Sequence, residues 1–249
     1  MGYTIAEAIT IPTALLLIGV AAWVLHHFLG QKSERVRTIP LTVLAIIILV
    51  GEVIKQWYHL GYLHDWTPWD LPVHFCSFFL IWFLFALCSR GKVRQMAYSC
   101  CLSGGMLVTL MLICAPRMIV QNACANIFAS FGTVHTFFFH IIVVAYWVWM
   151  LALGLYQPKK QHIWQTTLLY LGYFCIILMA AYLLNTNYTN ALYTDIAPLE
   201  YIRIHAGQVA YTLVMFGLGT AGIAGFSTAT YFATNAIYKH RRNDHYANQ

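Results

Sequence analysis

Seven apolar segments, each close to twenty residues long, limit this chain's fold more than any other feature. They cover residues 10–29, 39–59, 71–89, 96–115, 132–156, 165–184 and 207–230. A helix that crosses a bilayer needs about 20 predominantly apolar residues. The sequence therefore predicts an all-α, polytopic membrane protein: a bundle of about seven transmembrane helices.

Composition supports this fold class and bears on the number of domains. The chain has 249 residues, of which 60% are hydrophobic and only 9% are charged, whereas about 25% of the residues in a soluble domain are charged. Aromatic residues make up 16%, which suits two interfacial belts of Trp and Tyr. No polar stretch is long enough to form a soluble domain, so residues 1–249 are predicted to form a single transmembrane domain.

The basic residues predict the orientation of the bundle. Eleven of the fourteen Lys and Arg residues lie in alternate connections and the carboxy-terminal tail; they are Lys32, Arg35, Arg37, Arg90, Lys92, Arg94, Lys159, Lys160, Lys239, Arg241 and Arg242. The intervening connections hold only Arg117 and Arg203. Connections rich in Lys and Arg stay in the cytoplasm, so we expect the amino terminus outside and the carboxy terminus inside. The charge of +6 follows this topology, and nothing supports nucleic-acid binding.

Polar side chains within the second apolar segment share one helical face. Glu52, Lys55, Gln56 and His59 are separated by three, four and seven residues from the first of them, and these offsets fall on one stripe of an α-helix. Because polar groups inside a bilayer are costly, each indicates a functional site. Alternatively, Glu52 and Lys55 simply pair and neutralise each other.

Ionisable residues of three segments reach similar depths in the predicted outer half of the bilayer. Cys76 lies about 8 Å below the start of its helix and His140 about 12 Å below the start of its own. Glu52 reaches a similar level. Closer to the outer surface lie His74, His135, His205, Asn185 and Asn187. This distribution predicts a cavity open to the outside, because a continuous pathway would need polar residues at every level.

A Cys and a His at one depth are the minimum that nucleophilic catalysis requires. The imidazole takes the thiol proton, and the thiolate attacks an ester carbonyl. Seven Cys and eleven His residues also offer many chance pairs. On regular helices, His74 points about 200° away from Cys76 and His135 about 140° away from His140. All four side chains can face one point only if the segment around Pro72 is irregular.

Three short stretches carry a resemblance to a known family. They are Leu-Pro-Val-His-Phe-Cys at 71–76, His-Thr-Phe-Phe-Phe-His at 135–140 and Leu-Asn-Thr-Asn-Tyr at 184–188. The chain resembles the YwaF-type bacterial integral membrane proteins, a group similar to the vertebrate transmembrane protein 164 acyltransferases. More distantly, it is similar to the androgen-induced lipid-ester hydrolases. The resemblance implies a multi-pass protein of the bacterial cell membrane that acts on a membrane lipid.

The chain departs from the acyltransferase pattern at the nucleophile. In that group the nucleophilic Cys directly precedes the motif His, where this chain has Val73. Cys76 lies three residues later, which returns to nearly the same helical face. The histidine of the later helix falls on His140. The Lys-Pro pair that usually follows the third stretch is also replaced in this chain. No loop lysine is therefore available there to contact a phosphate group.

Our leading hypothesis is an intramembrane acyl-transfer or ester-cleaving enzyme that acts on a lipid in the outer half of the bilayer. Cys76 would be the nucleophile and His140 the general base, and this chemistry needs no cofactor or metal. Asn187 or His135 could stabilise the oxyanion. The residues expected to support catalysis or bind the substrate are Glu52, Lys55, His59, His74, His135, Asn187, Tyr188 and His205.

Two other functions remain open at this stage. The chain could be a non-catalytic binding or transport protein with a polar site at Glu52, Lys55 and His59, although the inner halves of the helices hold few polar residues. It could also be a bis-His haem protein, with axial ligands among His74, His135, His140 and His205. Independently of these functions, Cys114 and Cys124 bracket an outer connection and could form a disulfide.

Overall fold

The structure is a computed structural model that describes residues 4–120 and 123–247, and within them every regular element is helical. The seven longer helices are α1 (Ile5–Leu29), α3 (Ile39–Trp57), α4 (Phe78–Cys88), α5 (Gly91–Cys114), α7 (Phe131–Ala152), α8 (Lys160–Leu183) and α9 (Ala197–Ala247). The short elements are α2 (Glu34–Arg37), η1 (Tyr58–Leu63), η2 (Pro68–Asp70), η3 (Phe75–Ser77), α6 (Pro116–Val120) and η4 (Tyr188–Asn190). Among the described residues, six helices are long and apolar enough to cross a membrane, and Phe75–Cys88 is a shorter apolar helix. The predicted all-α polytopic membrane fold is confirmed.

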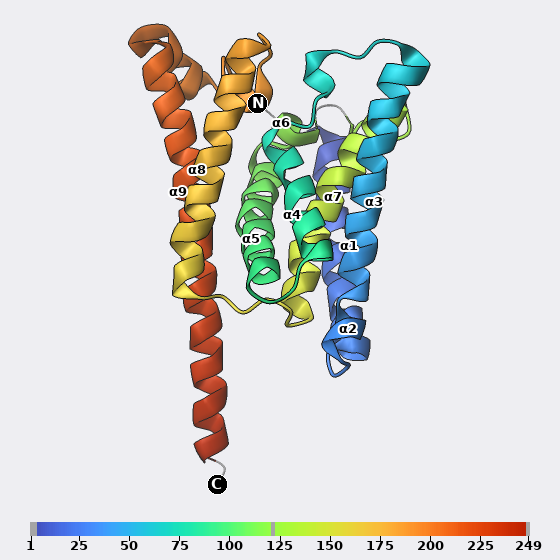
Figure 1. The fold of residues 1–249 in the computed structure, drawn as a ribbon, viewed down its shortest axis with the longest axis vertical. Coiled ribbons are helices and arrows are strands. Elements are labelled where there is room, and N and C mark those ends of the chain that lie inside the picture. Colours follow the sequence, from blue (N-terminus) through green and yellow to red (C-terminus); the bar gives the residue numbers. More distant parts are fainter. Residues whose placement is uncertain (1–3, 121–122, 248–249) are drawn as a thin grey trace.

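The helices alternate in direction, so the connections gather at two ends of the bundle (Figure 1). We call the end that holds α2 and the α4–α5 and α7–α8 connections the basic end, because the predicted clusters of Lys and Arg lie there. The opposite end, which holds the long α3–α4 and α8–α9 connections, is called the loop end. α8 and α9 pack as a pair, α3 and α1 pack on α7, and α5 contacts α4, α7, α8 and α9. The bundle is thus organised around α5 and α7.

Small residues allow neighbouring helices to approach α5 closely. A Cβ at Gly104 would lie 2.0 Å from the Tyr170 hydroxyl of α8, and one at Gly105 would lie 2.4 Å from the Trp147 ring of α7. The Tyr170 hydroxyl donates to the Cys100 carbonyl at 2.9 Å. Close packing and interhelical hydrogen bonds are the usual sources of helix association in a bilayer.

The helix predicted over 71–89 is shorter than expected. Its α-helical part begins only at Phe78, and residues 71–77 form turns and the 3₁₀ turn η3. Pro72 contributes to this irregularity because proline has no backbone N–H to donate and fixes its own φ. α9 contains a break at Gly207, whose φ of 86° and ψ of 170° are not helical. Residues 197–206 therefore form a helical segment of their own, ahead of the helix predicted from Gly207.

The disulfide that the sequence allowed between Cys114 and Cys124 does not form. Both are free thiols, with Cys114 exposed at the end of α5 and Cys124 buried. One side chain therefore faces out of the bundle and the other into it. This end of the bundle is instead connected by an ion pair at 3.1 Å between Arg117 of α6 and the buried carboxylate Glu7 of α1.

Candidate functional site

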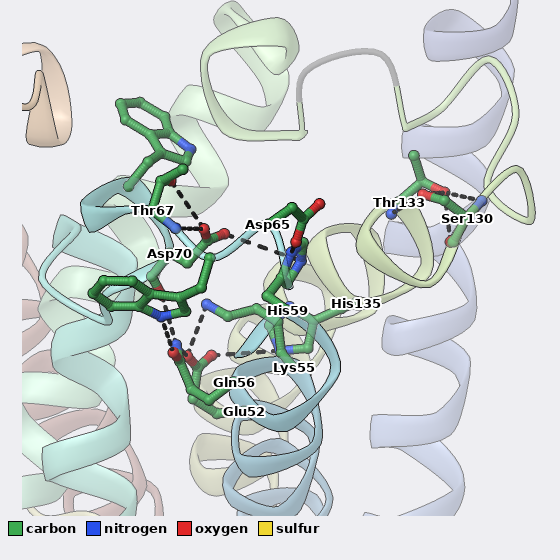
Figure 2. Close-up of polar contacts among 12 residues, drawn as sticks. Glu52, Lys55, Gln56, His59, Asp65, Thr67, Asp70, Ser130, Thr133 and His135 are labelled. Atoms are coloured by element: carbon green, nitrogen blue, oxygen red, sulfur yellow. Dashed lines mark hydrogen bonds and ion pairs between the residues drawn. The ribbon is translucent and has the colours of Figure 1, made fainter. Parts of the chain in front are cut away.

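A buried carboxylate on α3 is the centre of a polar network at the loop end (Figure 2). Glu52 is only 7% exposed. Its carboxylate lies 2.7 Å from the Lys55 ammonium and accepts a hydrogen bond from Gln56 at 2.8 Å. His135 Nε2 of α7 lies 3.5 Å from the other carboxylate oxygen; this nitrogen is buried and makes no hydrogen bond in the described residues. The stripe predicted on α3 therefore faces α7.

The α3–α4 connection covers this network. Trp66 donates its indole N–H to the Gln56 side-chain oxygen Oε1 at 3.0 Å, and the Gln56 side-chain amide donates to the Asp70 backbone carbonyl. His59 lies in the π-helical turn η1, where its Nδ1 is 2.9 Å from Asp65 and its Nε2 is 4.0 Å from Asp70. Turns of this type often occur at functional sites. Each polar side chain of the stripe thus has a partner nearby.

The irregular segment 71–77 is anchored to α8. The Tyr173 hydroxyl lies 3.1 Å from both the Val73 and the His74 carbonyl oxygens and donates to them. His74 Nε2 lies 3.3 Å from the Trp69 carbonyl, and the His74 ring packs against the Trp69 and Tyr188 rings. Because a carbonyl only accepts hydrogen bonds, Nε2 of His74 carries the proton.

The α8–α9 connection also contacts the irregular segment 71–77. The Thr189 hydroxyl accepts a hydrogen bond from the Phe75 backbone N–H at 2.7 Å, and Tyr188 donates to the Pro68 carbonyl. Burial raises the pKa of the Tyr188 phenol. Thr189 has a φ of 52°, in the left-handed region. A β-branched residue is rare there, and such strain persists where the surroundings enforce it.

His140 is buried on α7 in a defined protonation form. Its Nδ1 lies 2.7 Å from the Thr136 carbonyl, so Nδ1 carries the proton and Nε2 presents a lone pair. His140 lies within electrostatic range of His135 and His74, and His74 lies within that range of Glu52, Lys55 and Asp70.

Cys76 lies in η3, half-buried against the hydrophobic core. Its thiol makes no hydrogen bond to any residue in the described parts of the chain, His140 included. A direct thiol–imidazole contact is therefore not formed in this conformation, and the catalytic pairing of Cys76 with His140 stays a prediction.

Two of the predicted site residues have other partners. The Asn187 side-chain oxygen accepts from the backbone N–H groups of Leu192 and Tyr193, and its amide donates to the Tyr193 carbonyl at 3.0 Å. Asn187 therefore shapes its own loop. His205 is exposed on α9, stacks on Tyr201 with ring centroids 3.9 Å apart, and contacts none of the other predicted site residues in residues 4–120 and 123–247.

Several residues of the site were not singled out from the sequence. Trp66, Asp70 and Thr189 lie in polar connections whose course cannot be read from periodicity, and Tyr173 lies in an ordinary apolar helix. Tyr173 could have been identified as a tyrosine whose hydroxyl lies on the face of α8 that packs against residues 71–77. In the described residues no group of three or more His, Cys, Asp or Glu side chains could hold a metal ion.

The fold and the site together define a polytopic helical membrane protein with a polar site between α3, α7 and the two connections of the loop end. The stretches that carried the resemblance meet in this region: residues 71–76 contact Tyr188 and Thr189, and residues 135–140 contribute His135 and His140. The chain belongs to the TMEM164 family, whose sequence model matches residues 3–228. Searches for similar curated proteins and similar solved structures found no match.

Proposed function

We propose that this protein is a membrane-embedded enzyme that transfers or releases an acyl chain of a membrane lipid, with Cys76 as nucleophile and His140 as general base. The tautomer of His140 carries this proposal. The Thr136 carbonyl holds the proton on Nδ1, so Nε2 is free to accept a proton from a thiol. Family membership and the convergence of the three motif stretches support the same function.

The proposed reaction has two balanced steps. His140 Nε2 takes the Cys76 thiol proton, the sulfur forms a bond to the ester carbonyl carbon, and the carbon–oxygen bond of the ester breaks. The leaving alkoxide receives the proton from the imidazolium. In the second step a hydroxyl of water or of another lipid loses its proton to His140 and attacks the thioester carbonyl. The carbon–sulfur bond breaks, and the leaving thiolate takes the proton back from the imidazolium. His135 is the remaining candidate for stabilising the oxyanion, because its buried Nε2 has no hydrogen bond.

The cationic part of the site suits a lipid head group. Lys55 lies at the loop end with 17% of its side chain exposed, paired with Glu52. A phosphate group could share this ammonium, since lysine offers three donors. His59 and His74 flank the same region from η1 and from the turn before η3. These residues are proposed to bind the head group, with Glu52 orienting Lys55 and His135.

A second candidate function is non-catalytic binding of a polar ligand at the Glu52 network. The observation that favours it is the complete local pairing of Glu52, Lys55, Gln56 and His59, together with a Cys76 thiol that has no hydrogen-bonded base. A site built only to bind needs no nucleophile.

An acyl-adduct assay separates the two functions. Purified protein is incubated with a phospholipid that carries a fluorescent acyl chain, and the labelled residue is identified by mass spectrometry. We expect an adduct on Cys76 that disappears in Cys76→Ala and forms about 10²–10⁴-fold more slowly in His140→Ala. Cys175→Ala removes an exposed thiol of α8 and should behave as the parent protein.

The double variant provides a further criterion. Because the two residues act as one unit, Cys76→Ala/His140→Ala should be no worse than either single variant. Lipid turnover that persists in Cys76→Ala would show that the thiol is not the nucleophile. Lipid binding without turnover in the parent protein would favour the binding function.

A further inference from the structure

Two adjoining cavities lie at the basic end of the bundle, remote from the Glu52 network. The larger, of about 680 Å³, lies between the last turns of α4 and the first turns of α5 and α8; its lining includes Trp82, Phe85, Val93, Met96 and Leu169. The smaller, of about 270 Å³, lies between α2 and the α7–α8 connection, and its lining includes Arg37. Gln95 and Lys159 line both cavities, so the two are neighbours.

The two cavities differ in chemical character. The surface of the large cavity is mainly apolar, although six of its lining side chains are polar or charged: Lys92, Gln95, Lys159, Gln161, His162 and Gln165. Its volume falls within the range of about 300–1,000 Å³ that is usual for small-molecule pockets. The small cavity is bordered by Glu34, Arg37, Gln95, Gln157 and Lys159, which are all polar or charged. A mainly apolar groove beside a polar chamber matches an amphipathic ligand.

Two buried donors at these cavities have no partner. Trp82 is 7% exposed, and its indole N–H makes no hydrogen bond within the described residues. Arg37 donates from Nη1 to the Leu153 carbonyl at 2.7 Å, but its buried Nε–H is unpaired. Buried donors without partners are rare in folded proteins, so the hydrogen-bonding capacity of these two lining side chains is not fully used in this conformation.

The charges around the cavities favour an anion. Arg37, Lys92 and Lys159 are cationic, and Glu34 is the carboxylate among the lining residues. Glu34 is itself 3.7 Å from Arg94. Positive charge is therefore in excess. Basic pockets between helices near a membrane surface bind phospholipid head groups, and arginine suits phosphate oxygens because its guanidinium offers parallel donors.

We propose that these cavities form a binding site for an anionic glycerophospholipid from the leaflet at the basic end. Its phosphodiester lies in the small cavity with Arg37 and Lys159, and one acyl chain lies in the large cavity along Trp82, Phe85 and Met96. The site lies at the opposite end from His140 and the Glu52 network, so it does not depend on the proposed acyl-transfer function.

Native mass spectrometry of the purified full-length protein tests this site. The protein is titrated with phosphatidylglycerol or with phosphatidylcholine of the same acyl chains. We expect the parent protein to bind phosphatidylglycerol more tightly. Arg37→Gln/Lys159→Gln should weaken that binding by about tenfold or more and abolish the preference. The matched control Arg35→Gln/Lys160→Gln removes two neighbouring exposed charges that line neither cavity, and it should keep the preference.

A second variant tests the apolar cavity without changing charge. Val93 is half-exposed at the cavity lining, so Val93→Trp should fill part of the acyl-chain site and weaken the binding of both lipids. Equal losses in the charge variant and its control, or an unchanged preference in the charge variant, would overturn the proposal. If the charge variant does not fold, undiminished lipid binding by a folded Val93→Trp protein would overturn it instead.

Discussion

Removing the Tyr173 hydroxyl should loosen the segment that carries Cys76. In Tyr173→Phe the ring stays stacked on Phe78, at a centroid separation of 3.9 Å, while the Val73 and His74 carbonyls lose their shared donor. Leaving buried polar groups unsatisfied costs about 1–3 kcal/mol. Since about 1.4 kcal/mol corresponds to a factor of ten, the population in which residues 71–77 detach from α8 should rise about 5–150-fold.

The reactivity of Cys76 measures this population. In a background in which the exposed Cys88, Cys114 and Cys175 are changed to serine, Cys76 is the half-buried thiol that local opening exposes. If opening is fast and reversible, the rate of maleimide labelling is proportional to the open population. The labelling rate at Cys76 should therefore rise by the same factor of about 5–150. Tyr182→Phe, which removes an exposed hydroxyl from the same helix, should leave it unchanged.

Two outcomes would contradict this reasoning. A labelling rate that Tyr173→Phe leaves unaltered would mean that the two hydrogen bonds do not hold the segment. A rate that rises equally in Tyr182→Phe would mean that α8 as a whole was destabilised, and the anchor would then lie elsewhere.

Three further predictions follow from the packing and the topology. Glu52→Gln leaves the ammonium of its lysine partner without a counter-charge and should lower the free energy of unfolding by about 3 kcal/mol. The melting temperature in detergent should fall accordingly, and an unchanged melting temperature would show that the ion pair is not structurally important. Gly104→Ala should destabilise the fold by about 1–3 kcal/mol because the added Cβ meets the tyrosine hydroxyl of α8. Gly172→Ala places its Cβ in open space and should not destabilise the fold, so equal effects of the two variants would contradict the close packing. Reporter fusions at Lys159 and Tyr193 should report opposite sides of the membrane, and the same side for both would overturn the helix count.

The sequence was sufficient to predict the helices because the underlying signals are local. Hydropathy over about twenty residues locates a membrane helix, and Lys and Arg mark alternate connections. The prediction failed where proline affects the backbone: α4 begins at Phe78, after the irregular segment that contains Pro72. The helical segment at residues 197–206, which ends at the break at Gly207, was also not predicted. Hydropathy does not report such local changes in φ and hydrogen bonding.

The polar site could be predicted only in part. Helical periodicity alone placed Glu52, Lys55, Gln56 and His59 on one face, and the structure places that face against α7. The partners of these side chains could not be inferred in the same way. Trp66 and Asp70 reach the network because an irregular connection folds back over α3, and periodicity carries no information about the course of such a connection.

The amino-acid sequence by itself determined that this chain folds as a membrane-embedded helical bundle. The transfer of apolar residues into the bilayer and the preference of Lys and Arg for the connections outside it act on each segment separately. Only the tertiary structure decided which segments meet. Tyr173 anchors His74 across 99 residues of sequence, and Thr189 anchors Phe75 across 114. Contacts over such distances depend on how whole helices pack, and helix packing in a bilayer follows from shape and interhelical hydrogen bonds, which hydropathy does not encode.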